Sequence, residues 1–399
     1  MSRIAIIDTA VDPKYIGWEP IEFIDLCADG SAKPAPVEQP GADASPRTGG
    51  TPNAVSGIPA ISTEPPGTYM ASHGSLCAMV LDRCTTNYDL VNIRIFETDG
   101  GKVSGNIEKL VEALQLCLRL GIDVISMSSV SSLLSDSRHL YDITRELSKS
   151  TVILSALDNK LYATVPTGYP HVIGVRNDRS GFLAPGELAY DANDLFGANL
   201  YANCNFSFLR GMLRGPSNSF AVPMAAAYIN ELRNKGHSME GIWDKVRSLR
   251  AYPAIAATAL RIPPDRDQSR SMPIVCIMNA GTSLCSSVMD RLFEPYEVQS
   301  VALSYIDGPY DIRIRRARGD ANVADEVRFM ELFYKTDMVF VLGGDSLLEG
   351  IKQAVEIDIV VDCSHGEHAS FSYEETVELV PLEHIADRLH DILTAVDKP

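Results

Sequence analysis

The chain has 399 residues, of which 45% are hydrophobic and 22% charged, so it has the composition of a folded globular protein with room for two or three domains. Its 52 acidic residues outnumber the 35 basic ones, and the formal net charge is −17. Nucleic acids and anionic membranes are polyanions, so this charge argues against both as partners.

Apolar strands and amphipathic helices alternate along residues 1–250. The apolar run at 3–8 predicts a buried strand that opens the fold. Residues 28–68 are crowded with Pro, Gly, Ala and Ser, which cannot bury enough apolar surface to offset their ordering entropy, so they predict a long mobile surface loop. Further strands are predicted at 89–95, 122–127, 151–156 and 171–175, and helices at 105–120, 136–149 and 219–235. Near-continuous apolar strands predict a parallel sheet covered by helices on both faces.

A proline-rich, charged stretch near 262–272 marks a second break in the pattern. Strands are predicted after it at 273–278, 298–304, 337–342 and 357–362, and helices at 282–293, 322–335, 345–354 and 381–395. We therefore expect one α/β domain at 1–250, a linker at 251–271 and a smaller α/β domain at 272–399.

Four segments of the first domain carry residue types used in nucleophilic catalysis. Asp8 ends the first strand, His73 begins an apolar helix, Asn159 follows a strand, and Ser219 begins an Ala-rich helix. A serine hydroxyl is a weak nucleophile until an imidazole takes its proton, and a buried carboxylate must orient that imidazole. Asn159 and the Ser219 backbone N–H are candidates for binding an oxyanion. Taken singly, these residues also fit a helix cap, a structural histidine, a turn residue and an N-cap.

The order Asp, His, Ser is that of subtilisin and differs from the orders in chymotrypsin and the α/β-hydrolases. Residues 1–250 resemble the subtilisin-like serine peptidases. The matching segments are DT at 8–9, SHGS at 72–75, ISMSS at 125–129, VILSALDN at 152–159, TVPTGYPHVIGV at 164–175 and SFAVP at 219–223. The resemblance implies a subtilisin-like α/β fold and a peptide hydrolase. In it Ser219 is the nucleophile, His73 the base, Asp8 the orienting acid and Asn159 an oxyanion donor.

The same resemblance assigns residues that contact substrate. The segment at 125–129 corresponds to the strand that pairs with substrate, which assigns Ser126 and Ser128 to substrate binding. Lys160 follows Asn159 at the rim of the pocket for the residue before the cleaved bond, so an acidic residue is expected there. The alternative is that Lys160 points to water. A cis peptide bond is expected at Val165–Pro166.

Several positions depart from the family pattern. Ala10 and Asp158 stand where the family has glycine, Ser217 and Asn218 stand where the serine motif begins Gly-Thr, and MSSV replaces its MSLG. No calcium-type loop follows His73, so we expect activity without calcium. These changes leave open a second interpretation, a catalytically silent protein that binds peptides in the same groove or a scaffold that acts through residues 272–399.

Residues 272–399 contain neither a P-loop nor a GxGxxG segment, so a nucleotide site is not supported. VLGGDS at 341–346 is either a ligand site at a strand end or a tight turn. Cys363, His365 and His368 are zinc-ligand types without an evident fourth ligand, and a solvated loop is the simpler interpretation. We expect no metal and no cofactor, and an interaction or dimerisation role for this domain.

The predicted function is that of a serine endopeptidase with a peptide or precursor peptide as substrate, trimming a leader or maturing a dedicated peptide. No run of about 18 apolar residues and no signal-peptide core is present, and the eight cysteines contain no CxxC pair. We therefore expect a cytoplasmic location, with neither nucleic acid nor membrane as partner. A homo-oligomer or a maturation enzyme would bind through residues 272–399. The loop at 28–68 is a candidate cleavage site, including for the enzyme itself, and a passive insertion is the alternative.

Overall fold

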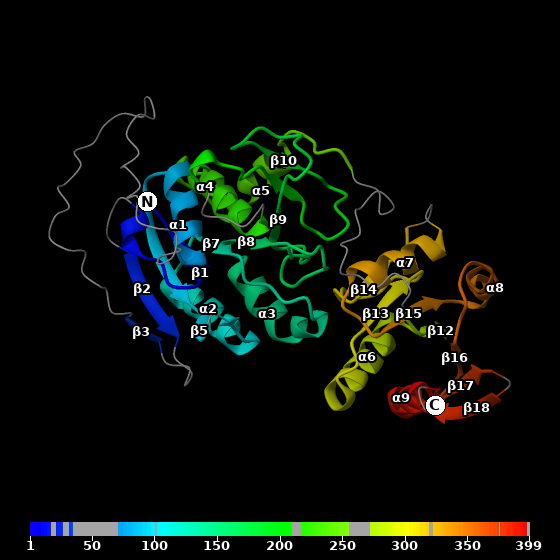
Figure 1. Ribbon diagram of the computed structural model, residues 1–399. Coiled ribbons are helices and arrows are strands. Elements are labelled where there is room, and N and C mark those ends of the chain that lie inside the picture. Colours follow the sequence, from blue (N-terminus) through cyan, green and yellow to red (C-terminus); the bar gives the residue numbers. More distant parts are fainter. Residues whose placement is uncertain are drawn as a thin grey trace, which may run out of the picture.

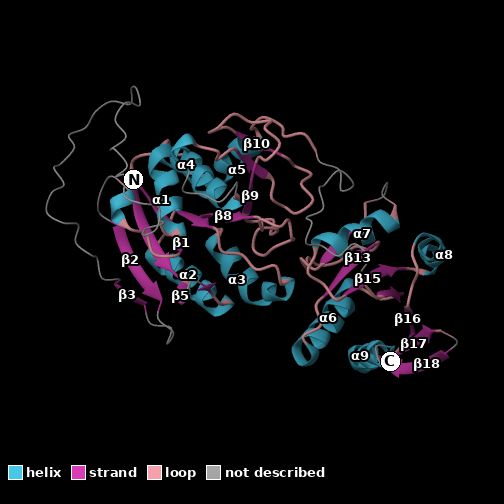
Figure 2. Cartoon of the chain, viewed as in Figure 1, coloured by secondary structure: helices cyan, strands magenta, loops and turns pink. Residues whose placement is uncertain are grey.

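The computed structural model describes residues 1–16, 21–26, 32–34, 71–99, 102–209, 217–254, 272–318, 322–374 and 376–396. Within these residues the chain forms a nine-stranded and a seven-stranded sheet, each packed with helices, and one short hairpin (Figure 1). Figure 2 shows the strands of both sheets in magenta with cyan helices beside them. The predicted α/β class is confirmed.

The first sheet has the strand order β10-β11-β9-β8-β7-β1-β4-β2-β3. Its strands are β1 (Ser2–Asp8), β2 (Ile21–Leu26), β3 (Ala32–Pro34), β4 (Tyr88–Arg94), β7 (Val124–Met127), β8 (Val152–Ala156), β9 (Ile173–Asn177), β10 (Leu188–Tyr190) and β11 (Leu200–Ala202). All neighbours are parallel except the two edge strands β3 and β10. A separate hairpin joins β5 (Glu97–Asp99) and β6 (Lys102–Ser104).

Helices cover both faces of the first sheet because its strands are apolar on both faces. They are α1 (His73–Cys84), α2 (Ile107–Leu120), α3 (Ser137–Leu147), α4 (Ala221–Asn234) and α5 (Met239–Arg247). Along the central strand β1, Ile4 and Ile6 belong to the core that contains α1 and α4. Ala5 and Ile7 belong to the core on the opposite face, with α2 and α3. This alternation is the period of two of a β-strand.

The second sheet has the order β14-β13-β15-β12-β16-β17-β18. Its strands are β12 (Ile274–Met278), β13 (Ser300–Ser304), β14 (Ile314–Arg316), β15 (Met338–Gly343), β16 (Ile359–His365), β17 (His368–Tyr373) and β18 (Thr376–Pro381). Its helices are α6 (Thr282–Tyr296), α7 (Val323–Phe333), α8 (Asp345–Ala354) and α9 (Ile385–Val396). The antiparallel pair β17 and β18 was not predicted, because its half-exposed strands lack the continuous apolar runs of the others.

One hydrophobic core contains buried residues of both units. Phe196, from the first unit, lies with its ring 5.5 Å from Phe329 and 5.6 Å from Phe333 on α7. The backbone N–H of Ala163 donates a hydrogen bond of 2.8 Å to the carbonyl of Phe333. The second unit therefore rests on the loop that follows β8, the strand that leads to Asn159.

Three further predictions concern local features. The predicted loop at 28–68 lies outside the described residues, apart from β3, which pairs with β2 at the edge of the first sheet. The predicted linker at 251–271 lies outside the described residues from residue 255 onward. The Val165–Pro166 peptide bond is cis, as predicted. Among the described helices, none combines the length and apolar character needed to cross a bilayer.

Candidate active site

Parallel strands place their carboxyl ends at one edge of the first sheet, where ligands bind in open α/β sheets. Asp8 is the last residue of β1, and Asn159 lies shortly after the end of β8. His73 is the first residue of α1, and Ser219 lies in a short 3-10 turn, Asn218–Phe220, directly before α4. The structure thus brings the four predicted catalytic residues to the same edge of the sheet.

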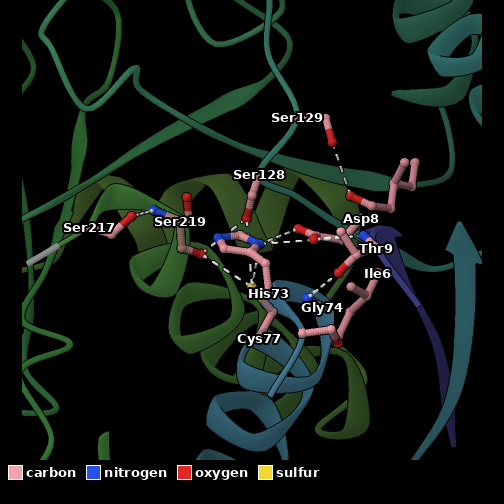
Figure 3. A network of polar contacts seen from close by, with 12 residues as sticks. Ile6, Asp8, Thr9, His73, Gly74, Cys77, Ser128, Ser129, Ser217 and Ser219 are labelled. Atoms are coloured by element: carbon pink, nitrogen blue, oxygen red, sulfur yellow. Dashed lines mark hydrogen bonds and ion pairs between the residues drawn. The ribbon is translucent and has the colours of Figure 1, made fainter. Parts of the chain in front are cut away.

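The Asp8 carboxylate holds the His73 imidazole. Nδ1 of His73 lies 2.8 Å from both carboxylate oxygens, and Asp8 is only 1% exposed. The backbone N–H of Thr9 also donates to Asp8 Oδ1, at 2.7 Å. Figure 3 shows one ring nitrogen of His73 turned to Asp8 and the other facing Ser219. A buried carboxylate on Nδ1 leaves Nε2 as the nitrogen that can take a proton from a hydroxyl.

The SHGS segment explains how His73 reaches Asp8. Ser72 caps α1, because its hydroxyl accepts a hydrogen bond of 3.1 Å from the Ser75 N–H. The N–H of Gly74 donates to Thr9 Oγ1 at 2.8 Å, which fastens the helix start to the end of β1. A Cβ at Gly74 would lie 2.3 Å from the Thr9 carbonyl oxygen, so any other residue would push α1 away from Asp8.

Asn218 fastens the turn that carries Ser219. Its Nδ2 donates to the carbonyls of Leu157 and Asp158, at 2.9 and 3.2 Å. Its Oδ1 accepts a hydrogen bond of 3.0 Å from the N–H of Asn177, at the end of β9. Asn218 is 1% exposed, so these bonds are made away from water. They tie the Ser219 turn to the ends of two adjacent strands.

We expect Asn218→Ala to lower the free energy of unfolding by about 1–3 kcal/mol, because it leaves buried backbone groups without partners. Urea denaturation followed by circular dichroism measures this loss. Asn234→Ala is the matched control, since Asn234 is exposed and its amide bonds to the Asn87 carbonyl at 3.0 Å. A loss at Asn218 no larger than the loss at Asn234 would contradict the anchoring role.

Ser219 is 8% exposed, and its carbonyl accepts a hydrogen bond of 3.1 Å from the Ser128 hydroxyl. Its own hydroxyl makes no hydrogen bond to His73 in the described part of the chain. Catalytic hydrogen bonds of this kind are often long in the free enzyme and tighten when substrate binds. The His73 ring packs 5.2 Å from the ring of Phe220, which sets its distance from the Ser219 turn.

The two predicted oxyanion donors point at a common position. Oδ1 of Asn159 accepts from the Asn218 N–H at 2.8 Å and from Arg179 Nη2 at 3.2 Å, which turns the amide nitrogen the other way. That nitrogen donates to the Ser217 hydroxyl oxygen at 3.1 Å. The Ser219 N–H donates to the same oxygen at 3.2 Å. Two donors that converge in this way have the arrangement that an oxyanion hole requires.

Cys77 is a site residue that sequence reasoning missed. It lies one helical turn after His73, with Sγ 3.8 Å from His73 Nδ1 and 3.8 Å from the Ser219 carbonyl oxygen (Figure 3). The available signal was the i,i+4 spacing, which places both side chains on one face of α1. Burial raises the pKa of the Cys77 thiol.

Among the described residues, one group of three has ligand atoms close enough together to hold a metal ion. Its members are Asp8, His73 and Cys77, whose ligand atoms lie within 4.8 Å of one another. An ion there would compete with the Asp8–His73 hydrogen bond. Cys363, His365 and His368 form no such group among the described residues, although His365 and His368 are paired across the β16–β17 turn. The VLGGDS segment ends β15 and starts α8, where Asp345 accepts from Asn279 at 2.9 Å.

The pKa of His73 is raised above its ordinary value. Burial lowers it, but the neighbouring Cys77 and the Asp8 carboxylate raise it by a larger amount in sum. The protonated imidazole therefore persists above the pH at which an ordinary histidine loses its proton. Because the general base must be neutral, turnover is expected to increase as pH rises through the raised pKa.

We expect NMR titration of His73 in Ser219→Ala to give a midpoint above the ordinary value of about 6.5. The Ser219→Ala background prevents proteolysis during the measurement. Asp8→Asn in this background removes the carboxylate and should lower the midpoint. A midpoint at or below about 6.5 with Asp8 present would show that burial, rather than the carboxylate, dominates.

The three residues predicted to bind substrate, Ser126, Ser128 and Lys160, differ in how far they are buried. Ser126 lies inside β7, paired with Ile6 and Leu154 on its two sides and 2% exposed, so it cannot contact a substrate, and its assignment was wrong. The matched segment begins inside β7, and only the residues after Met127 lie beyond the end of that strand. Ser128 is half-buried and contacts Ser219. Lys160 is exposed beside Asn159, with its N–H bonded to Asp158 Oδ1 at 2.8 Å, and its substrate contact stays a prediction.

No protein-family model matches this chain, and no curated protein matches it. Solved structures similar to it include the prenylagaramide maturation protease PagA, with 13% identity over 59% of this chain and 76% of that one and a TM-score of 0.35. A lanthipeptide protease has 15% identity over 62% of this chain and 78% of that one, with a TM-score of 0.36. The epidermin leader peptide processing serine protease EpiP from Staphylococcus aureus has 12% identity over 61% of this chain and 68% of that one, with a TM-score of 0.37.

Proposed function

We propose that this chain is a subtilisin-like serine endopeptidase that cleaves peptide bonds through an acyl-enzyme on Ser219. One observation carries the proposal. A buried carboxylate, Asp8, holds the imidazole of His73 at 2.8 Å, and that ring faces Ser219 beside the two converging donors of Asn159 and Ser219 itself. These are the parts that acyl transfer by a serine needs.

In the proposed reaction, Nε2 of His73 takes the Ser219 proton as Oγ attacks the carbonyl carbon of the scissile bond. The negative charge that develops on the carbonyl oxygen is stabilised by the Asn159 amide and the Ser219 N–H. The protonated imidazole then gives its proton to the leaving amine, and the ester on Ser219 remains. A water molecule, deprotonated by the same imidazole, hydrolyses the ester. Asp8 stays ionised and stabilises the imidazolium.

We propose a dedicated peptide as substrate, cut at one place, as in removal of a leader during peptide maturation. The motif departures at Ala10, Asp158 and Ser217 support a specialised peptidase. The second α/β unit packs on the loop after β8 and offers a precursor, a maturation enzyme or a second copy of the chain an additional surface. We place this function in the cytoplasm and assign it no cofactor.

One observation favours a second candidate function, a catalytically silent peptide-binding protein. The position where both oxyanion donors converge is filled by the Ser217 hydroxyl, and the Ser219 hydroxyl makes no hydrogen bond to His73 in the described residues. A protein that only binds peptides needs neither contact. The two candidates differ in whether new peptide N-termini are formed.

Cleavage of a proteome-derived peptide library, read by N-terminal mass spectrometry, tests the proposal. Wild type is expected to form new N-termini that share a sequence pattern, and Ser219→Ala is expected to form none. The absence of new N-termini with either protein, together with equal binding of the same peptides, would favour the silent protein.

Lys160 is expected to favour an acidic residue just before the cleaved bond, because an ammonium group at the pocket rim can pair with a carboxylate. The contact is partly solvated, so the expected preference for Glu over Lys is several-fold, or about 1 kcal/mol. A substrate series that differs only at this residue measures it. Lys160→Glu should reverse the preference, and the same discrimination by both proteins would exclude the contact.

A further inference from the structure

The oxyanion position of this site is filled by a side chain of the protein itself. The Ser217 hydroxyl oxygen lies 3.1 Å from Asn159 Nδ2 and 3.2 Å from the Ser219 backbone N. An oxyanion must lie at hydrogen-bond distance from the same two donors. A neutral hydroxyl oxygen therefore stands where the charged oxygen of the tetrahedral intermediate would form.

The N-cap role of Ser217 explains only one of the two hydrogen bonds that its hydroxyl oxygen accepts. Ser217 caps the turn Asn218–Phe220, and for that its hydroxyl needs only the Ser219 N–H. The second hydrogen bond comes from Asn159, which belongs to a different loop and is held in place by the Asn218 N–H and Arg179. Both donors needed for the oxyanion are thus bound to the same hydroxyl oxygen.

The backbone at Ser217 permits the hydroxyl to leave without a change of the turn. Its φ of −133° and ψ of 140° lie in the extended region, which any residue adopts. The residue is half-buried, while Asn218 and Ser219 on its C-terminal side are buried. Rotation about the Cα–Cβ bond is then the small movement that empties the position between the two donors.

We propose that Ser217 is a gate of the oxyanion hole, a positioning residue whose hydroxyl must be displaced by the carbonyl oxygen of the substrate before acyl transfer. This inference rests on the proposed peptidase function. Binding energy from the rest of an extended peptide can offset the displacement, whereas a small substrate offers none. The gate therefore keeps hydrolysis of small esters and short peptides slow and favours a long peptide that fills the site.

Ser217→Gly tests the gate, because glycine removes the hydroxyl and is nearly as good an N-cap as serine. The probe is a fluorophosphonate, whose phosphoryl oxygen takes the oxyanion position when Ser219 attacks phosphorus and fluoride leaves. We expect the maximal rate of inactivation to rise on the order of tenfold, since the removed competitor is worth about one hydrogen bond. The probe concentration for half-maximal rate should stay the same. A small ester should show the same split, with a raised kcat and an unchanged KM.

Ser238→Gly is the matched control. Ser238 caps α5 through a hydrogen bond of 3.1 Å from the Gly241 N–H and lies beyond the end of α4 opposite to Ser219, so its loss should change the melting temperature alone. Ser217→Ala is a second variant for the case that the glycine variant does not fold, and it should be accelerated too. Ser217→Thr retains a hydroxyl and should stay as slow as wild type.

The outcomes separate the gate from the peptidase function. Inactivation of folded Ser217→Gly at the wild-type rate, or more slowly, overturns the gate and leaves the peptidase proposal standing. No inactivation of wild type or of any folded Ser217 variant overturns both. Inactivation of Ser217→Gly that persists after Ser219→Ala is added places the nucleophile elsewhere and also overturns both. Faster inactivation of Ser217→Gly than of wild type, lost when Ser219→Ala is added, supports the gate.

Discussion

Replacing Ser219, His73 or Asp8 by alanine is expected to reduce kcat on a cleaved peptide by roughly 10⁴–10⁶-fold each. Ser219 supplies the attacking oxygen, His73 carries the proton both ways, and Asp8 orients His73 from 2.8 Å within the protein interior. The Asp8 variant should lose the least, since an imidazole without its carboxylate can still take a proton.

The three losses are not expected to add, because each residue acts only through the other two. The triple variant should therefore be about as slow as Ser219→Ala alone, with a residual rate due to the oxyanion donors. Ser238→Ala and His139→Ala are matched controls at exposed positions outside the site. A Ser219→Ala protein that still hydrolysed the peptide, or losses that added, would show that these residues do not form a catalytic unit.

Replacing Asn159 by alanine is expected to lower kcat by about 10²–10³-fold, or 2.7–4 kcal/mol, with KM little changed, because the amide binds charge that exists only in the transition state. The amide is aimed by two donors on its oxygen, from Asn218 and Arg179. Asn159→Asp keeps the shape but replaces a donor by an anion, so its loss should be at least as large.

Arg179→Ala is the informative comparison for Asn159. It removes one of the two contacts that aim the amide and leaves the amide itself, so a smaller loss in kcat is expected, again with KM unchanged. Steady-state kinetics on one peptide measure all three variants. An Asn159→Ala protein that lost activity only through a raised KM would assign Asn159 to substrate binding instead of to the oxyanion.

Local patterns were sufficient to predict most of the fold and to bring four candidate catalytic residues to attention. Continuous apolar strands such as 3–8 and 151–156 indicated a parallel sheet, and such a sheet places the ends of its strands at one edge. Asp8 and Asn159 were found because they lie at or just after the ends of strands, and His73 and Ser219 because they lie at the starts of apolar helices. The resemblance to a known family then supplied their roles.

The sequence pattern could not predict side-chain contacts between segments that lie far apart in the chain. The serine at 217 was visible as a departure from the family motif, but its hydroxyl meets Asn159 only after the loops following β8 and before α4 come together. Cys77 looked like one more apolar helix position until the helix placed it against Asp8 and His73. Ser126 was misassigned because a motif does not show where a strand leaves the sheet interior. The β17–β18 hairpin was missed because its strands alternate polar and apolar residues and have no continuous apolar run.

The most direct test of the central claim is the mass of the protein after prolonged incubation with excess fluorophosphonate, followed by mapping of the modified peptide. A serine is phosphonylated to completion only when a base removes its proton and donors stabilise the phosphoryl oxygen. The proposal predicts one adduct per chain, located on Ser219, and no adduct on Ser219→Ala or after denaturation of wild type. An unmodified wild-type chain, or an adduct that maps to another residue, would contradict it.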